Sequence, residues 1–335
     1  MKAGFALGDG CPVPVRAGDH ADVLLYTSPD DDERREVIEN LSLDPYDLES
    51  ALDADEISRV EFSTACASII WKQPKNVSVQ DQLRFDVGSM GLFLHQGRLI
   101  VIVGDGAPSF AAREFRHCRS VLDVLLKVLD QTVHHYLGHL KVIKQITVEL
   151  GSKITGSMEN QYLLQMLVLG ESLIYYINAI EANSGVLSKL QTHARRLGLS
   201  AEHVDTLHGI GVDNQQCARQ ARIYSDVVSG LMDARGTIIN NNVSILLKKL
   251  TLISIIFLPL NLIASIGGMS EFSMMTQGID WRISYSLFGL AMVALGWGSW
   301  HMLVQVLERR PHREKVRRRS PSDPIQPLGN TSPRP

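Results

Sequence analysis

The polar residues best placed to contact an ion lie on one face of an apolar segment in the last third of the chain. Steps of three or four residues select a face of mostly polar or small side chains on a surface otherwise rich in Leu, Ile and Phe. This stripe consists of Asn241, Ser244, Leu247, Thr251, Ser254, Leu258, Asn261, Ser265 and Gly268. Polar side chains inside a bilayer face protein or water, so the stripe indicates either a contact between helices or the wall of a channel.

The composition of the stripe favours one of these two interpretations, and its length favours the other. Its small and hydroxyl side chains favour a helix contact. Asn261 favours a channel, and so does the continuation of the stripe toward Asn240 and Asp233, because a packing seam within a membrane need not be longer than the membrane. In an oligomer with this face turned inward, Leu247 and Leu258 would form apolar rings, which gate ions by dewetting.

Six histidines offer a second set of ligands for a metal ion: His134, His135, His139, His193, His203 and His208. Imidazole nitrogen suits Zn²⁺ better than it suits the harder Mg²⁺. Histidines on helices are also common on solvent-exposed surfaces, so the sequence leaves both interpretations open.

Charge is distributed unevenly along the 335 residues. Residues 1–246 carry a net charge of −9 and the remainder carries +6, which together give −3. Within the remainder, two uncharged runs, 250–270 and 283–307, are 21 and 25 residues long. Because about 20 residues cross a bilayer as a helix, these runs rule out a simple soluble protein.

Basic residues flank both apolar runs. Lys248 and Lys249 precede the first, and a cluster follows the second, namely Arg309, Arg310, Arg313, Lys315, Arg317, Arg318 and Arg319. By the positive-inside bias both flanks are cytoplasmic, which two spans satisfy as a hairpin with 271–282 as the outer loop. The cluster by itself also fits a nucleic-acid patch. Its place beside a membrane span favours a topology anchor, and we expect no nucleic-acid partner.

Residues 1–10 lack the apolar segment of a secretory signal peptide, so we expect the large N-terminal part to stay in the cytoplasm. Cys11, Cys66, Cys118 and Cys217 are far apart and form no CxxC pair. This spacing indicates reduced, mostly buried thiols rather than a zinc ribbon or a disulfide framework. No phosphate-binding loop, HExxH, GxSxG or dinucleotide motif occurs in a useful context, so the sequence predicts neither an enzyme nor a bound cofactor.

The first 120 residues have a mixed α/β pattern. Asp44 and Pro45 are typical of a helix start, with Asp44 as the cap and Pro45 in the first turn. Strands are predicted at 65–71, 90–94 and 99–103, the last two joined by a short connection. This part of the chain is therefore expected to form a sheet with accompanying helices.

From about residue 121 the pattern changes to long helical periodicity, over 121–150, over 159–197 and then beyond a break. Gly198 and Ser200 mark that break, since Gly ends helices and Ser caps them. After this break, the next proline in the chain is Pro259. A helix that begins near the break is therefore expected to run without interruption into the first apolar run, a length of about 100 Å at 1.5 Å per residue.

The C-terminal sequence resembles the signature of the CorA superfamily of divalent-cation transporters. The resemblance is carried by residues 250–251, 257–260 and 268–270, followed by a short loop and a second apolar run with a basic tail. Upstream, residues 43–49 are similar to the family's LHPLxxED-like segment. The order of an α/β part before long helices is also the family's order, so the resemblance covers nearly the whole chain.

The resemblance implies an α+β fold that assembles as a homopentamer in the plasma (bacterial inner) membrane, with both termini cytoplasmic and a pore of five first-span helices. It implies a cytoplasmic α/β domain at 1–120, a funnel of long helices at 121–245, a pore helix at 246–270, an outer loop at 271–282, a second transmembrane helix at 283–307 and a basic tail at 308–335.

The expected outer mouth departs from the family's Gly-Met-Asn signature. This chain has Gly268, Met269 and Ser270, so a ring expected to carry carboxamides carries hydroxyls. In the magnesium branch that ring is implied to bind the waters of hydrated Mg²⁺, an ion that dehydrates reluctantly. Glu271 would raise the cation concentration at the mouth, or is a solvated loop acid. Asp233 aligns with an acidic residue of the family's intracellular regulatory site, or is a solvated charge.

These departures favour the ZntB-type, zinc-transporting branch, with Zn²⁺ as cargo and not as a cofactor. The expected pore residues within the membrane-proximal helix are then Asn241, Ser244, Leu258 and Asn261. The alternatives are a Mg²⁺/Co²⁺ transporter of the CorA type and a non-conducting, CorA-shaped, metal-responsive membrane scaffold. The expected partners are other copies of the chain, membrane lipid and divalent cations.

Overall fold

The computed structural model describes residues 1–8, 11–16, 19–63, 66–75, 84–110, 115–156, 161–267, 274 and 277–308. The chain divides into two units, Met1–Ile238 and Ile239–Pro335. The first unit holds a sheet with helices packed on both of its faces, and the second holds the apolar C-terminal helical segments.

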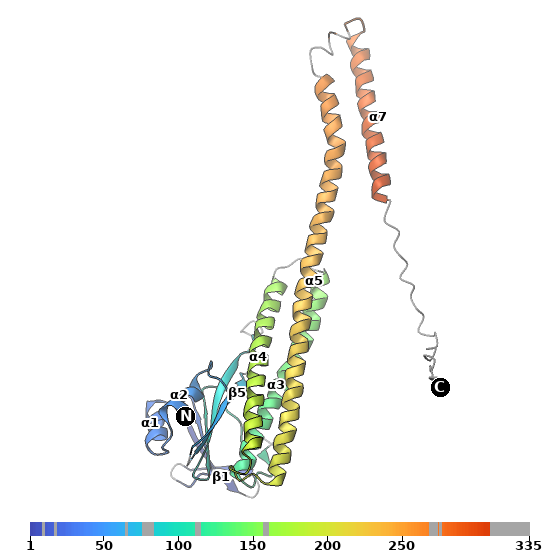
Figure 1. The fold of residues 1–335 in the computed structure, drawn as a ribbon. Helices are drawn as coiled ribbons and strands as arrows, with labels where there is room; N and C mark the ends of the chain where they lie inside the picture. The colour runs from blue at the N-terminus through green and yellow to red at the C-terminus, as the bar shows by residue number, and fades with distance from the viewer. Residues whose placement is uncertain are drawn as a thin grey trace, which may run out of the picture. The chain divides into compact units, whose positions relative to one another are not determined.

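A seven-stranded sheet forms the core of the first unit, with the strand order β2-β1-β3-β7-β6-β5-β4 (Figure 1). The strands are β1 (Lys2–Gly8), β2 (Cys11–Val15), β3 (Val23–Thr27), β4 (Arg59–Phe62), β5 (Cys66–Pro74), β6 (Val87–His95) and β7 (Arg98–Val103). β3 and β7 pair in parallel, and the other neighbours pair antiparallel. The three predicted strands correspond to β5, β6 and β7, whereas the sequence pattern does not predict β1 to β4.

The strands β5, β6 and β7 are buried on both faces, which explains why their sequences are nearly continuous apolar runs without alternation. A two-residue loop of Gln96 and Gly97 joins β6 to β7. Both residues have positive φ, 49° and 78°, which is typical of the type I′ turn that matches the twist of a hairpin.

One face of the sheet packs against α1 (Asp31–Glu39) and α2 (Pro45–Leu52). The predicted start of α2 is confirmed, because the Asp44 carboxylate accepts a 2.9 Å hydrogen bond from the backbone of the first turn. Ala51 of α2 approaches the sheet so closely that a Cβ added to Gly91 would lie 2.5 Å from the Cβ of Ala51. This contact requires glycine in the middle of β6.

The opposite face packs against three long helices, α3 (Val121–Gly156), α4 (Gln161–Thr192) and α5 (Ala201–Gly267) (Figure 1). Farther from the sheet these helices form a second core with one another, which includes Tyr136, Leu173, Tyr176 and Cys217. The predicted break before α5 is confirmed, since Gly198 has a φ of 70° and the Ser200 hydroxyl accepts from the backbone of the first turn.

Three described helices are long and apolar enough to cross a membrane, namely Gln161–Thr192, Ala201–Ile266 and Trp281–His301. The first of these is α4, whose apolar side chains fill both cores of the first unit. The C-terminal part of α5 and the helix α7 (Trp281–Glu308) lie in the second unit and expose almost all of their apolar side chains. The predicted apolar run at 283–307 falls within α7.

Candidate functional site

The uninterrupted helix α5 carries the predicted stripe residues that the structure describes. Asn241, Ser244, Leu258 and Asn261 are all exposed on this helix, and Leu258 has 72% of its surface accessible. Pro259 lies inside the helix, where its missing N–H leaves the carbonyl group of Ile255 without its usual helical donor. These four stripe residues therefore lie on the surface of α5 and are not buried by packing within one chain.

Three of the four hydroxyl groups of the stripe share one orientation. Ser244 donates its proton to the carbonyl oxygen of Asn240 at 2.9 Å, Thr251 donates to that of Leu247 at 2.9 Å, and Ser254 donates to that of Leu250 at 3.0 Å. Such bonds to the carbonyl group four residues earlier are the usual way for a helix to satisfy a hydroxyl. Because the proton is used within the helix, each hydroxyl oxygen keeps lone pairs that point outward. This face offers acceptors, which suit a cation or its bound water.

The four outer-mouth residues of the prediction, Gly268, Met269, Ser270 and Glu271, lie outside the described residues. Asp233 lies on α5 within the first unit, with an exposed side chain. Its backbone carbonyl group accepts a hydrogen bond from the Thr237 hydroxyl at 3.1 Å. The carboxylate is thus accessible, as either interpretation of this residue requires.

The six histidines do not gather at one place. His139 contacts the Tyr176 hydroxyl at 2.6 Å, and His193 stacks beside Phe62 with ring centroids 4.8 Å apart. His203 bonds the Asp123 carboxylate at 2.8 Å. Burial raises the pKa of Asp123, but the bonds from His203 and from neighbouring backbone amides outweigh burial and lower it. These three histidines therefore have structural partners.

His134 differs from the others because it lies beside two carboxylates. Among the described residues, Asp130, His134 and Asp213 form the one group of three such side chains whose ligand atoms all lie within 4.8 Å of one another. The sequence pattern indicates His134 as a candidate ligand but indicates neither aspartate. The i, i+4 spacing of Asp130 and His134 was a usable signal, whereas the approach of Asp213 from α5 depends on helix packing.

The four cysteines are free, as the sequence predicts. Cys118 and Cys217 are buried, and Cys11 and Cys66 are half-buried. Burial raises the pKa of the Cys217 thiol to about 12, which keeps it protonated and unreactive near neutral pH.

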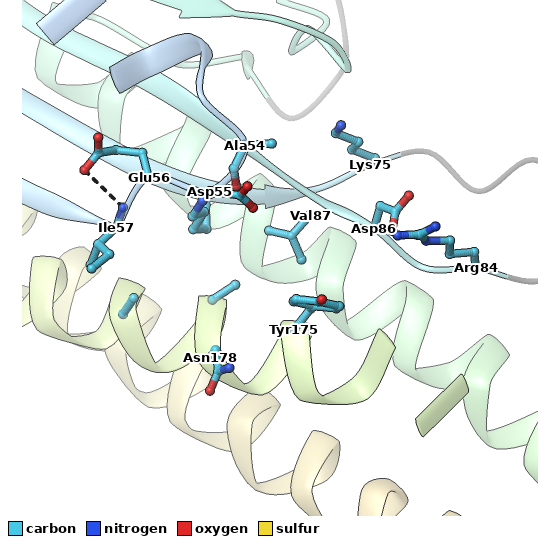
Figure 2. A pocket seen from close by; sticks show the side chains of 13 residues that line it. Ala54, Asp55, Glu56, Ile57, Lys75, Arg84, Asp86, Val87, Tyr175 and Asn178 are labelled. Carbon is cyan, nitrogen blue, oxygen red and sulfur yellow. Dashed lines mark hydrogen bonds and ion pairs between the residues drawn. The ribbon is translucent and has the colours of Figure 1, made fainter. Parts of the chain in front are cut away.

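A pocket of ≈ 580 Å³ lies in the first unit between the sheet and α4 (Figure 2). Figure 2 shows that charges of both signs line it and that Arg84 lies against Asp86, where the two form a 2.8 Å ion pair. The amine of Lys72 is held by the Ala54 carbonyl group and by the Ser89 hydroxyl. Three acidic and three basic side chains line the pocket, so it presents no concentrated charge of one sign.

The sequence and the fold of this chain resemble those of known transporters. A family model described as CorA-like Mg²⁺ transporter protein matches residues 24–310. The cobalt/magnesium transport protein CorA of Methanocaldococcus jannaschii is 22% identical over 251 residues, which make up 72% of this chain and 77% of that protein.

The fold is similar to that of several solved structures, among them the following two. The complete structure of the CorA magnesium transporter from Methanocaldococcus jannaschii has a TM-score of 0.73 at 19% identity, and it covers 92% of this chain and 96% of that one. The ZntB cytoplasmic domain from Vibrio parahaemolyticus has a TM-score of 0.55 at 14% identity, and it covers 72% of this chain and 97% of that one. At these identities the likeness is one of fold.

Proposed function

Because this chain belongs to the family of CorA-like Mg²⁺ transporter proteins, we propose that it conducts a divalent metal cation through a pore lined by the exposed stripe of α5. The observation that carries the pore assignment is the orientation of the stripe's hydroxyl groups. Ser244, Thr251 and Ser254 use their protons within the helix and present oxygen acceptors outward. Asn261 adds a polar carboxamide at membrane depth, where polar side chains are expensive and usually functional.

Assembly follows from conduction. We assign two membrane spans, the C-terminal part of α5 and α7, because the apolar side chains of α4 are accounted for by the cores of the first unit. One pair of helices cannot enclose a pore, so several copies must contribute, and we propose a homopentamer. The positive flanks of the two spans support an orientation with both termini in the cytoplasm, and we propose the bacterial inner membrane as the location.

Zn²⁺ is our proposed cargo, with Mg²⁺ and Co²⁺ as the competing candidates. Ser270 replaces the carboxamide that the family uses at the outer mouth, and a hydroxyl has less reach to the water shell of Mg²⁺. The fold likeness to a ZntB domain is compatible with this choice, and the named relative of similar sequence is a cobalt/magnesium transport protein.

Purified full-length protein in proteoliposomes tests both parts of the proposal. Uptake of Zn²⁺, Mg²⁺, Co²⁺ and Ni²⁺ is measured side by side at one membrane potential, with protein-free liposomes as the blank. We expect uptake above the blank, with Zn²⁺ faster than Mg²⁺. Faster Mg²⁺ uptake would overturn the cargo assignment, and the absence of uptake for all four ions in folded protein would favour the non-conducting scaffold.

A further inference from the structure

Two aspartates and a histidine converge where α3 lies beside α5. Asp130 and His134 are one turn apart on α3, so their side chains share a face, and Asp213 reaches them from α5. One ligand atom from each residue lies within 4.8 Å of the other two. All three residues belong to the first unit and are well separated along the chain from the pore stripe.

The charges around this cluster are incompletely balanced. Lys127 lies 3.4 Å from the Asp130 carboxylate, and His134 Nδ1 lies 3.2 Å from the same carboxylate. Within the described part of the chain, Asp213 has no ion-pair partner. The Asp130 side chain is only 26% exposed. Two carboxylates held this close on neighbouring helices repel each other, and a bound cation would remove that repulsion.

The donor set selects among divalent ions. An imidazole nitrogen with two carboxylate oxygens is a set that Zn²⁺ accepts at tetrahedral sites, with water in the fourth position. Mg²⁺ prefers six oxygen ligands in octahedral geometry and does not gain from imidazole. The Nδ1–H of His134 donates to the backbone oxygen of Asp130 at 3.0 Å, so the ring orientation is already restrained and Nε2 is the nitrogen left to bind an ion.

We propose that Asp130, His134 and Asp213 form a binding site for Zn²⁺ or a similar borderline divalent cation inside one protomer. A bound ion would join α3 to the N-terminal part of α5 and would stabilise that packing by its binding free energy. α5 is also the helix that carries the pore stripe. A role in regulating conduction by cytoplasmic zinc therefore rests on the proposed function, whereas the binding itself does not.

The test uses full-length protein in detergent, stripped with a chelator and titrated with Co²⁺ as a spectroscopic probe. Tetrahedral Co²⁺ absorbs visible light far more strongly than octahedral Co²⁺, so it reports the site and ignores hydrated ions in a pore. We expect an intense band that saturates at one Co²⁺ per protomer, that Zn²⁺ abolishes by displacement and that excess Mg²⁺ leaves in place. A band that Mg²⁺ displaces, or no band at all, would overturn the proposal.

Variants assign the band to the cluster. His134→Gln and Asp213→Asn remove one ligand each with little change in size, and both should weaken binding by more than the roughly 10- to 100-fold that loss of an outer-shell partner costs. His208→Gln is the matched control, because His208 is an exposed histidine of α5 outside the cluster. Circular dichroism checks that each variant is folded. Equal affinity in the two ligand variants and the control would refute the assignment.

Uptake assays on the same preparations separate this proposal from the proposed function. Normal metal uptake together with an absent band would refute the cluster site and leave conduction standing. A normal band in protein that takes up no metal would support the site and refute conduction.

Discussion

The carboxamide of Asn183 links α4 to the edge of the sheet. β4 begins at Arg59, opposite Ile70, so it does not pair with β5 at Lys72. There the Asn183 side chain donates to the Lys72 carbonyl group at 2.8 Å and accepts from the Lys72 N–H at 3.0 Å. It also accepts from the Ser58 hydroxyl at 2.8 Å and is fully buried. One side chain thus replaces the strand partner that β5 lacks at this position.

Asn183→Ala should leave buried backbone groups of Lys72 unpaired, each at a cost of about 1–3 kcal/mol. We expect the free energy of unfolding to fall by about 3 kcal/mol, seen as a decrease of several degrees in the unfolding midpoint. Circular dichroism during heating in detergent measures the midpoint. Asn178→Ala, at an exposed position of the same helix, is the control, and equal midpoints for the two variants would contradict this role for Asn183.

Ser270 is the residue that the selectivity proposal depends on. If a ring of carboxamides favours hydrated Mg²⁺, Ser270→Asn should raise Mg²⁺ uptake relative to Zn²⁺ uptake, because the amide adds reach and both donor and acceptor groups. The measurement is the ratio of the two uptake rates at equal protein amount and membrane potential. An unchanged ratio would mean that this ring does not select the ion.

The role of a residue at the end of its own helix could be predicted from the sequence. Contacts between residues that are far apart along the chain could not. Asp44 and Gly198 act within one turn of their own helix ends, so their types alone indicate their roles. Asn183 contacts a residue 111 positions away, and Asp213 meets His134 only after α5 has packed on α3. Neither pattern nor spacing contains that information.

At the scale of elements, α3 and α4 are joined by a contact from a histidine that burial holds in its neutral form. His139 of α3 bonds the hydroxyl of Tyr176 on α4 at 2.6 Å. Burial, and then the neighbouring His135, lower the pKa of His139 from 6.5 to about 4. Between these two pH values the unfolded chain binds the proton and the folded protein does not. The stability linked to His139 is therefore fully present above pH 6.5 and is lost as the pH falls toward 4.

His139→Gln should keep a hydrogen bond to Tyr176 but remove the titrating group. We expect the decrease of the unfolding midpoint between pH 6.5 and 4 to become smaller in this variant than in the natural protein. Thermal unfolding followed by circular dichroism across this range measures it, with His208→Gln, an exposed histidine, as the control. The same decrease in all three proteins would show that His139 does not link these helices to pH.

The long helices and the buried strands were predictable because their apolar patterns are long and continuous. The edge strand β2 was not, since Pro12 and Pro14 lie within it and proline argues against a strand. Both are tolerated because β2 pairs on one side only, with β1. β4 has four residues, too few to give a period, and its place is fixed by pairing with β5.

At the scale of the whole molecule, the proposed pore requires several copies of the chain to assemble. Native mass measurement in mild detergent and in lipid should give five copies of the 37.1 kDa chain. The physical reason is that two spans from a single chain do not surround a pore, whereas several copies of α5 do. A monomer or a dimer under both conditions would contradict the pore model.

The two apolar runs near the C-terminus were predicted correctly as long helices, because a run of about 20 apolar residues has the length and composition of a membrane-crossing helix. α4 shows the limit of that argument. It is as long and apolar as a membrane span, yet Leu173 and Leu187 are buried against other parts of the first unit. Hydropathy cannot tell a protein core from a lipid environment, and only the packed structure separates the two.

If cations pass along the polar face of α5, as we propose, the Asn261 side chain lies in their path. Asn261→Leu would add an apolar ring beside that of Leu258, so divalent-cation influx into proteoliposomes should be nearly abolished while the assembly stays intact. Ile263→Leu is the matched control, because two residues along a helix place it on the opposite face. We predict near-zero influx for Asn261→Leu and natural influx for Ile263→Leu. Natural influx for Asn261→Leu in intact assemblies would contradict the claim and would make Asn261 part of a contact between helices.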